Sequence, residues 1–257
     1  MACNRVDAFV GAGCKGNRAA VALLDAPIDE AAKQAAAHDF GEPATAFVEL
    51  AMVDGANPVR WFAPDREIAL CGHGALAAGH VLLARVEGDT VNLRSAGGRE
   101  LEIRRLPGEA RYEIALPAIQ TEPRDWTELA EALCGEPAEI RWNPAGYALA
   151  LFANPQQIAA LAPDPEALAR LGNLQVIASA PGSLAGVSAD ITSRVFSPGG
   201  CEDAATGSAH AVLAPCWGER LGREMFVAHQ ASARGGWFEC RMAGDIAWLG
   251  GQCVEVC

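Results

Sequence analysis

The apolar positions of the chain fall into short runs typical of strands and a few longer runs typical of helices. The strand-like runs alternate between apolar and polar positions or are apolar throughout, and Gly, Pro, Asn or Asp residues bound them. The pattern predicts strands at residues 5–10, 45–53, 59–63, 90–94, 100–105, 111–116, 145–153, 174–180, 191–197, 223–230, 237–242 and 246–256. It predicts helices at residues 30–38, 75–85, 126–133, 156–161, 165–171 and 208–221, and a short helix that Asn17 caps.

The predicted helices are embedded among hairpins, and one of them is apolar on nearly every side. Residues 75–85 carry few polar positions, which predicts a helix that other elements surround. The turn signals at residues 97–98 (GG) and 107–108 (PG) separate neighbouring strands and favour antiparallel pairing. We therefore expect an α+β fold with mostly antiparallel sheets.

One cassette of the sequence occurs twice, separated by roughly half of the chain. Residues 60–64 (RWFAP) recur as residues 194–198 (RVFSP), and residues 71–75 (CGHGA) recur as residues 204–208 (AATGS). Each copy predicts a strand, a turn, a glycine-containing loop and the start of a helix. We expect two similar domains, residues 1–118 and 119–257, whose glycine loops face each other.

Composition and charge exclude several classes of protein. The chain has 257 residues, of which 51% are hydrophobic and 20% charged, so it has ample material for a core. A net charge of −12 argues against nucleic acid as a partner. The absence of a long apolar run and of a signal-like N-terminus predicts a cytoplasmic protein that does not bind membranes. No dinucleotide or P-loop fingerprint occurs.

The nine cysteines predict reduced thiols rather than a disulfide framework or a metal site. Their number is odd, their spacing is irregular, and no Cys-x-x-Cys motif occurs. Cys71 and His73 lie two residues apart without further spaced ligands, so we expect no metal there. Most of the other cysteines are expected to be small buried residues.

The glycine loops are the candidate binding site. Each lies at a predicted helix start, where backbone N–H groups lack partners within the helix and the macrodipole favours an anion. Gly72 and Gly74 in the first loop, and Thr206, Gly207 and Ser208 in the second, allow a ligand to approach this backbone. Together the loops would hold the carboxylate or the enolate-like intermediate of a small anionic metabolite. The alternative is that both are ordinary strand-to-helix turns.

Three side chains in or beside the loops are candidate catalytic groups. Asp203 precedes the second loop and would move a proton, or would only cap the turn. Cys71 would act as a thiolate acid or base, or would be a small buried residue. His73 would donate to a bound anion or shuttle a proton, or would only pack within the loop. His80 and His210 lie on predicted helices and are expected to be structural.

These motifs resemble the PhzF-like phenazine biosynthesis family, which has the diaminopimelate epimerase fold. The resemblance covers nearly the whole chain. Its segments are residues 6–9, 16–21, 59–64, 67, 70–74, 193–198, 202–210, 230 and 234–236.

The resemblance implies two pseudo-symmetric domains, each a sheet wrapped around a central helix, with substrate in the cleft between them. It also implies a homodimer, no cofactor, no metal and an isomerisation by proton transfer. His73 and Asp203 would bind substrate and assist proton movement, and Gly72, Gly207 and Ser208 would contribute loop donors.

Two departures from the family pattern leave the mechanism open. Ala44 occupies the position of the family's acid/base glutamate, and Glu42, on the same side of an extended chain, is the candidate replacement. The related epimerases use two cysteines, and here Ala204 stands where the second would be, which excludes a two-thiol mechanism. The alternatives are a cofactor-free isomerase, a small-acid binding protein that has lost catalysis, and a thiol-dependent enzyme that acts through Cys71.

Overall fold

The computed structural model describes residues 1–256 and divides them into two compact units. Unit 1 contains residues 1–11 and 15–116 and the end of the chain from residue 250 onward. Unit 2 contains residues 12–14 and 117–249. No single cut of the chain separates the units, because the last strand begins in unit 2 and ends in unit 1. Among residues 1–256, no helix has the length and apolar character that a membrane crossing needs.

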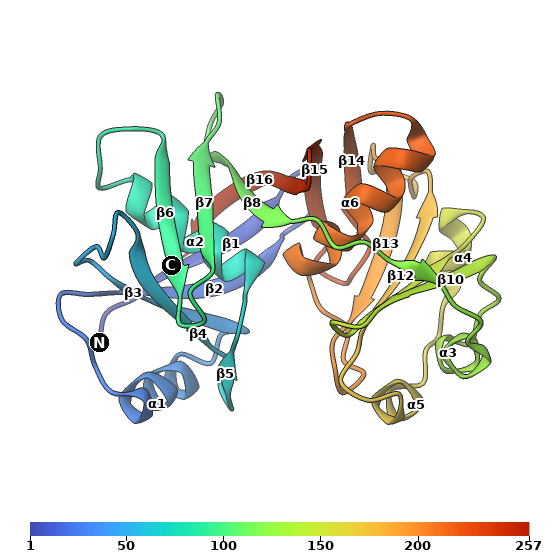
Figure 1. Ribbon diagram of the computed structural model, residues 1–257, viewed down its shortest axis with the longest axis horizontal. Coiled ribbons are helices and arrows are strands. Elements are labelled where there is room, and N and C mark those ends of the chain that lie inside the picture. The colour runs from blue at the N-terminus through green and yellow to red at the C-terminus, as the bar shows by residue number, and fades with distance from the viewer. Residues whose placement is uncertain (257) are drawn as a thin grey trace. The chain divides into compact units, whose positions relative to one another are not determined.

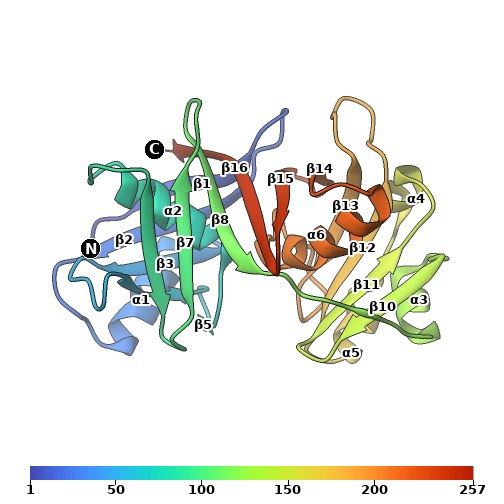
Figure 2. The same ribbon diagram turned by 45° about the horizontal axis from the view of Figure 1, so that its top comes forward.

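Unit 1 is a ring of strands around one helix (Figures 1 and 2). Hydrogen bonds join neighbours in the order β1-β2-β3-β4-β6-β7-β8-β16, and β16 also pairs with β1, which closes the ring. Most pairs are antiparallel, whereas β2–β3 and β4–β6 are parallel. The strands are β1 (Asn4–Val10), β2 (Asn17–Leu24), β3 (Ala44–Glu49), β4 (Asn57–Phe62), β5 (Glu67–Ile68, which pairs with β4), β6 (Thr90–Ser95), β7 (Glu100–Arg105), β8 (Arg111–Pro117) and β16 (Ile246–Val256).

The helix inside the ring is α2 (Gly72–Leu83), and it confirms the expectation of a surrounded helix. Every residue of α2 except His80 is buried. Because strands cover the helix on all sides, an apolar sequence without a polar stripe is the one that suits it. The first turn of α2 is therefore packed within the core of unit 1, which holds its backbone N–H donors in place.

A second helix, α1 (Glu30–Phe40), covers the outer face of the same strands. Asp29 caps it by accepting a hydrogen bond from the N–H of Ala32 (2.7 Å), as the sequence predicts. Ala37 of α1 packs in one cluster with Phe47 of β3 and Phe62 of β4. Since successive side chains of a strand point to opposite faces, this cluster identifies which residues of β3 and β4 face outward and which face α2.

The predicted helix after Asn17 is wrong, because residues 17–24 form strand β2. β2 pairs antiparallel with β1 and parallel with β3, so it is a central strand. The run after Arg18 is apolar on both faces, as a strand buried between α1 and α2 requires. A run of alanine and valine is compatible with either a helix or a strand. Here the hydrogen-bonded pairing with β1 and β3 makes it a strand.

Unit 2 has an open sheet with helices on it. Its neighbour order is β16-β15-β14-β13-β12-β11-β10-β9, with parallel pairs at β11–β12 and β13–β14. The helices are α3 (Thr127–Leu133), α4 (Pro155–Ala160), α5 (Pro165–Arg170) and α6 (Gly207–Leu221). The strands are β9 (Glu122–Pro123), β10 (Glu139–Asn143), β11 (Tyr147–Leu151), β12 (Gln175–Pro181), β13 (Ile191–Phe196), β14 (Met225–Gln230) and β15 (Gly236–Ala243). The sequence pattern missed β10, whose residues are all half-buried.

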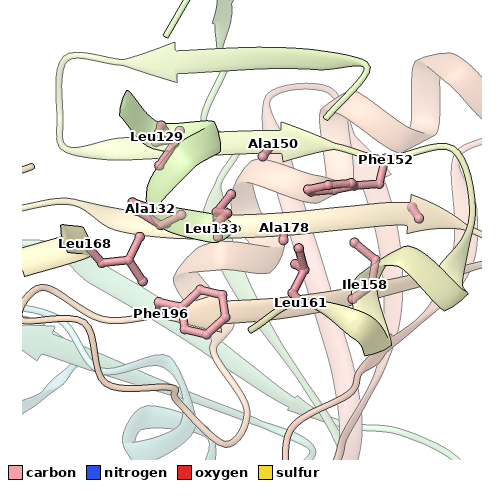
Figure 3. Close-up of a cluster of buried hydrophobic side chains, with 13 residues drawn as sticks. Leu129, Ala132, Leu133, Ala150, Phe152, Ile158, Leu161, Leu168, Ala178 and Phe196 are labelled. Carbon is pink, nitrogen blue, oxygen red and sulfur yellow. The ribbon is translucent and has the colours of Figure 1, made fainter. Parts of the chain in front are cut away.

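The main core of unit 2 lies between its sheet and the three short helices. Leu133 of α3, Ile158 of α4 and Leu168 of α5 belong to one buried cluster with Phe152 and Phe196 (Figure 3). This layer covers one face of the sheet and leaves α6 to cover the other. Strand β13 is thereby fixed between two packed layers, and the loop that follows it leads to α6.

Helix α6 continues through Pro215, although a proline usually interrupts a helix. Pro215 has no N–H to donate to the carbonyl of Ala211 four residues earlier. The N–H of Ile119, in the segment that enters unit 2, donates to this carbonyl instead (2.9 Å). The helix therefore runs from Gly207 to Leu221 without leaving that acceptor unpaired.

Candidate functional site

In unit 1, an arginine on β4 fixes the turn that leads to α2. Arg60 donates to both carboxylate oxygens of Glu67 (2.7 and 2.6 Å) and lies over the ring of Phe62, 5.2 Å from its centre. Hydrogen bonds from Arg60 hold the pKa of the Glu67 carboxyl below its usual range. This forked ion pair joins the strand to the segment just before Cys71.

The same construction recurs in unit 2 and confirms that the cassette is a structural repeat. Arg194 on β13 donates to both oxygens of Glu202 (2.7 and 2.9 Å) and lies 5.3 Å from the ring centre of Phe196. Arg194 also donates to the carbonyl of Leu161 (2.7 Å). Glu202 therefore anchors the second loop.

The helix starts match in backbone conformation, and they correct the alignment of the repeat. Cys71 caps α2 with φ −130° and ψ 102°, and Thr206 caps α6 with φ −123° and ψ 102°. Thr206 rather than Ala204 is therefore the counterpart of Cys71, two positions later than the sequence comparison placed it. The exclusion of a two-thiol mechanism is unchanged, because a threonine hydroxyl replaces the second thiol.

Neither cap side chain occupies the N–H groups of its own helix. Cys71 makes no side-chain capping bond to α2, and Thr206 makes none to α6. The first N–H groups of a helix have no partner within it, and they carry the positive end of the helix dipole. Both starts thus have the electrostatic character of an anion site.

In unit 1, the structure brings together a thiol, an imidazole and an amide. The Sγ of Cys71 lies 3.6 Å from both ring nitrogens of His73, and the Nδ2 of Asn17 lies 3.4 Å from His73 Nδ1. All three side chains are buried. Asn17 comes from the start of β2, so its contact with α2 spans 56 positions of the sequence. The sequence predicts Asn17 as a helix cap and places it in the family-like segment of residues 16–21, without a predicted contact to His73.

The Cys71 sulfur is equally far from the two nitrogens of the His73 ring. A strong hydrogen bond to an imidazole nitrogen points along the lone pair or the N–H bond of that one nitrogen. A sulfur equidistant from both nitrogens is not in line with either of them. This geometry does not align the pair for thiol-to-imidazole proton transfer, which weakens the thiol-dependent alternative.

The structure contradicts the expectation that Glu42 shares the side of Ala44. Phe47 packs outward with α1, so Ala44, three residues earlier, faces α2. Glu42 instead accepts a hydrogen bond at Oε1 from Nε of Arg5 on β1 (2.8 Å).

The position of Arg5 shows which face of the sheet Glu42 lies on. Arg5 shares its face of β1 with Asp7, and Asp7 bonds Arg18 (2.9 and 3.1 Å). Arg18 follows Asn17 in β2 and so points away from α2. Glu42 therefore lies on the outer face of the sheet, whereas Ala44 and His73 lie on the inner face.

In unit 2, a network of hydrogen bonds holds Asp203 beside the start of α6. Asp203 Oδ1 accepts from the N–H of Ala204 (2.8 Å), and Oδ2 accepts from the hydroxyl of Thr206 (2.6 Å). The turn-capping role weighed for Asp203 is thus present. Because each carboxylate oxygen has two lone pairs, these capping bonds do not by themselves prevent Asp203 from accepting a proton.

Gln230 on β14 is a loop anchor whose role the sequence did not suggest. Its Oε1 accepts from the N–H of Thr206 (2.9 Å), and its Nε2 donates to the carbonyl of Asp203 (2.8 Å) and to the hydroxyl of Thr206 (3.1 Å). Ser208 donates to Oε1 of Gln175 (2.9 Å) on β12. The two glutamines tie the loop to the sheet on either side of β13 and orient its polar groups.

His210 supports the same loop from inside unit 2, as its expected structural role requires. Its Nδ1 donates to the carbonyl of Thr206 (2.8 Å), and its ring stacks on Phe238 with centroids 3.5 Å apart. The side chain is fully buried, and burial lowers its pKa to about 4. His210 is therefore a neutral imidazole with its proton on Nδ1 at neutral pH.

The burial of His210 predicts a loss of stability in acid. The unfolded state takes up a proton near pH 6.5 and the folded state near pH 4, so stability rises with pH across this window and falls as pH drops through it. We expect the free energy of unfolding, measured with urea, to fall by about 2 kcal/mol from pH 7 to pH 5 on account of His210. The variant His210→Asn should show a smaller difference; an unchanged difference would contradict the assignment. Burial also lowers the pKa of His80 and His229, which adds to the same trend.

The remaining cysteines do not extend either site. The eight cysteines among residues 1–256 are thiols rather than disulfide halves, and Cys257 lies outside the described residues. Burial raises the pKa of the Cys240 and Cys253 thiols well above its ordinary value, which makes them unreactive. Within residues 1–256 no group of three or more His, Cys, Asp or Glu side chains is arranged to hold a metal ion.

The ring of strands around a central helix, the helix starts and the repeated cassette define a diaminopimelate epimerase-like fold. A solved structure of a hydroxyproline epimerase from Agrobacterium vitis shares this fold, with a TM-score of 0.60 over 99% of this chain and 91% of that one at 15% identity. A solved PhzF-family phenazine biosynthesis protein from Enterococcus faecalis is more similar, with a TM-score of 0.88, 32% identity and coverage of 100% and 98%.

Sequence comparison gives the family. The profile of the phenazine biosynthesis-like proteins, PhzC-PhzF, matches residues 6–252. An uncharacterized isomerase of Pseudomonas aeruginosa is 36% identical over 98% of this chain and 95% of its own. The chain belongs to the phenazine biosynthesis-like family, and its relatives point to an isomerase or epimerase of the PhzF type.

Proposed function

We propose that this protein is a cofactor-independent isomerase that moves a proton within a small carboxylate-bearing metabolite. The observation that carries the proposal is the loop from Asp203 to Ser208. It places the Asp203 carboxylate next to the first turn of α6, where the cap residue makes no side-chain hydrogen bond to the helix. A proton carrier beside an oxyanion site is what removal of a proton next to a carboxylate requires.

The proposed step begins with removal of a proton from carbon. The Asp203 carboxylate accepts a proton from the carbon beside the substrate carboxylate, and the electron pair of the C–H bond moves onto the carboxylate oxygens. Backbone N–H groups at the start of α6 hold the resulting dianion. Asp203 then returns the proton at another carbon or on another face, which completes an isomerisation or an epimerisation without a net change in atoms.

We propose that the loop of unit 1 also binds an anion. Gly72 and Gly74 carry no side chain that could shield the N–H groups at the start of α2, and His73 offers a hydrogen-bond donor there. Loss of this loop is therefore expected to weaken the binding of small carboxylic acids.

Incubation in D2O with a panel of small carboxylic acids tests the proposed function. The panel should vary the group beside the carboxylate, including hydroxy, amino, unsaturated and cyclic acids. We expect mass spectrometry of at least one recovered acid to show one added deuterium that depends on the protein. If no acid in a panel that covers these groups gains deuterium above the protein-free control, the proposed isomerase activity is wrong.

One observation favours a second candidate function, a small-acid binding protein without catalysis. Ala44, where the family resemblance expects a glutamate, is fully buried on the α2 face of β3. On this alternative, small acids raise the melting temperature of the protein without gaining deuterium, and Ala44→Glu introduces exchange. Deuterium exchange by the unmodified protein would exclude it.

A further inference from the structure

Asn17 has a place in unit 1 that the proposed function does not use. It is 1% exposed and is the first residue of β2, directly opposite Ala8 of β1. The next residue of β1, Phe9, has a φ of 61°, and the pairing of β1 with β16 shifts there. Positive φ is uncommon for an aromatic residue, and bulges of this kind re-aim a nearby chain segment. The backbone around Asn17 is thus held in an irregular form at the point where its amide meets His73.

The contact between these two side chains has a direction. The Nδ2 of Asn17, 3.4 Å from His73 Nδ1, is a donor and has no lone pair to accept with. His73 Nδ1 must therefore be the acceptor, which requires that it carry no proton. In a neutral imidazole, the proton then sits on Nε2. A second proton on Nδ1 would bring the N–H of His73 and the N–H of Asn17 face to face, with no acceptor between them. The contact therefore also disfavours the imidazolium form of His73.

We propose that Asn17 is a positioning residue that keeps His73 neutral, with its one proton on Nε2. This inference rests on the proposed function for its consequence. A neutral imidazole that gave up that proton would become an imidazolate, which side chains do not form at neutral pH. His73 then acts on a bound acid as a hydrogen-bond donor and not as the group that carries the proton.

The chain contains an internal reference for this assignment. Nδ1 of His210 faces the carbonyl of Thr206, which can only accept, so the proton of His210 is on Nδ1. The two histidines near the two helix starts are thus expected to be opposite tautomers. The Cys71 sulfur lies 3.6 Å from both ring nitrogens of His73, so its distances favour neither form.

Nitrogen-15 NMR of the full-length protein with labelled histidine tests the proposal at neutral pH. The sequence has only five histidines, and the loss of one spin system in His73→Gln assigns the signals of His73. We expect the unmodified protein to show His73 protonated at Nε2 and His210 protonated at Nδ1. A His73 signal protonated at Nδ1, or doubly protonated, would overturn the proposal outright.

Two variants separate a positioning role from simple packing. Asn17→Asp puts an acceptor against Nδ1 and is expected to shift His73 toward the Nδ1–H or imidazolium form by at least about tenfold. Asn17→Leu removes the donor and is expected to yield a mixture of tautomers, with the His210 signals unchanged in both variants. If His73 keeps the same tautomer in both variants, Asn17 does not select it.

The spectra do not depend on turnover, so the two proposals fail separately. If no acid exchanges deuterium but the tautomers are as stated, the proposed function is wrong and the role of Asn17 stands. If an acid does exchange, Asn17→Asp is expected to lower kcat more than it raises KM, because substrate binding also draws on backbone donors. If Asn17→Asp and the unmodified protein have equal activity, the tautomer that Asn17 selects at His73 does not affect catalysis.

Discussion

Replacement of Asp203 by asparagine is expected to slow deuterium exchange into a substrate acid by about 100- to 10,000-fold. The amide has nearly the same shape and can still accept from Ala204 or Thr206, but it cannot take up a proton from carbon. The rate of deuterium gain, followed by mass spectrometry at equal protein concentration, measures the effect. Circular dichroism and the melting temperature establish that the variant is folded.

A matched control for this change is Asp245→Asn. Asp245 is an exposed residue of the turn between β15 and β16, and its carbonyl, which the substitution leaves in place, accepts from Ala118. We expect exchange at the unmodified rate. If Asp203→Asn also retained full exchange, Asp203 would be only a turn cap, and the proton would have to move through another group.

Replacement of Gly16 by alanine is expected to lower the melting temperature by at least about 10 °C. Gly16 has a φ of 68°, and a Cβ there would lie 2.1 Å from the carbonyl oxygen of Ala8. Backbone cannot move aside as a flexible side chain can, so we expect a loss of more than about 4 kcal/mol. For a chain of this length each kcal/mol corresponds to roughly 2–4 °C.

Gly41→Ala is the control for this second prediction. Gly41 ends α1 with the same φ of 68°, but nothing lies within 4 Å of the position of its Cβ. The variant therefore bears only the conformational cost of alanine in this region, about 1–2 kcal/mol. Similar melting temperatures for the two variants would contradict the close approach at Gly16. Because Gly16 precedes Asn17, the loss of order at Gly16→Ala should also disturb the His73 signals.

The elements that the sequence predicted well are those with local signals. The α1 helix has its cap at Asp29, and α2 shows its buried position through an apolar sequence on every side. The doubled cassette indicated a structural repeat, which the ion pairs of Arg60 and Arg194 confirm. Each of these signals lies within a few residues of the feature that it predicts.

The errors concern features that distant contacts decide. Asn17 is an acceptable helix cap, but pairing with β1 and β3 makes it a strand residue, and its contact with His73 joins segments 56 positions apart. Glu42 was assigned to the side of Ala44 by counting along an extended chain, whereas Arg5 draws it to the other face. The repeat was aligned on its glycines, although the backbone angles of Cys71 and Thr206 set the true correspondence.

A crystal structure of the protein with an acid that exchanges its proton tests the central claim most directly, that the start of α6 and the Asp203 carboxylate form the site of proton transfer. We predict a ligand oxygen within hydrogen-bond distance of the first-turn N–H groups of α6, with the exchanging carbon near the Asp203 carboxylate. An acid bound away from the start of α6, with the N–H groups of that first turn occupied by the protein's own side chains, would contradict it.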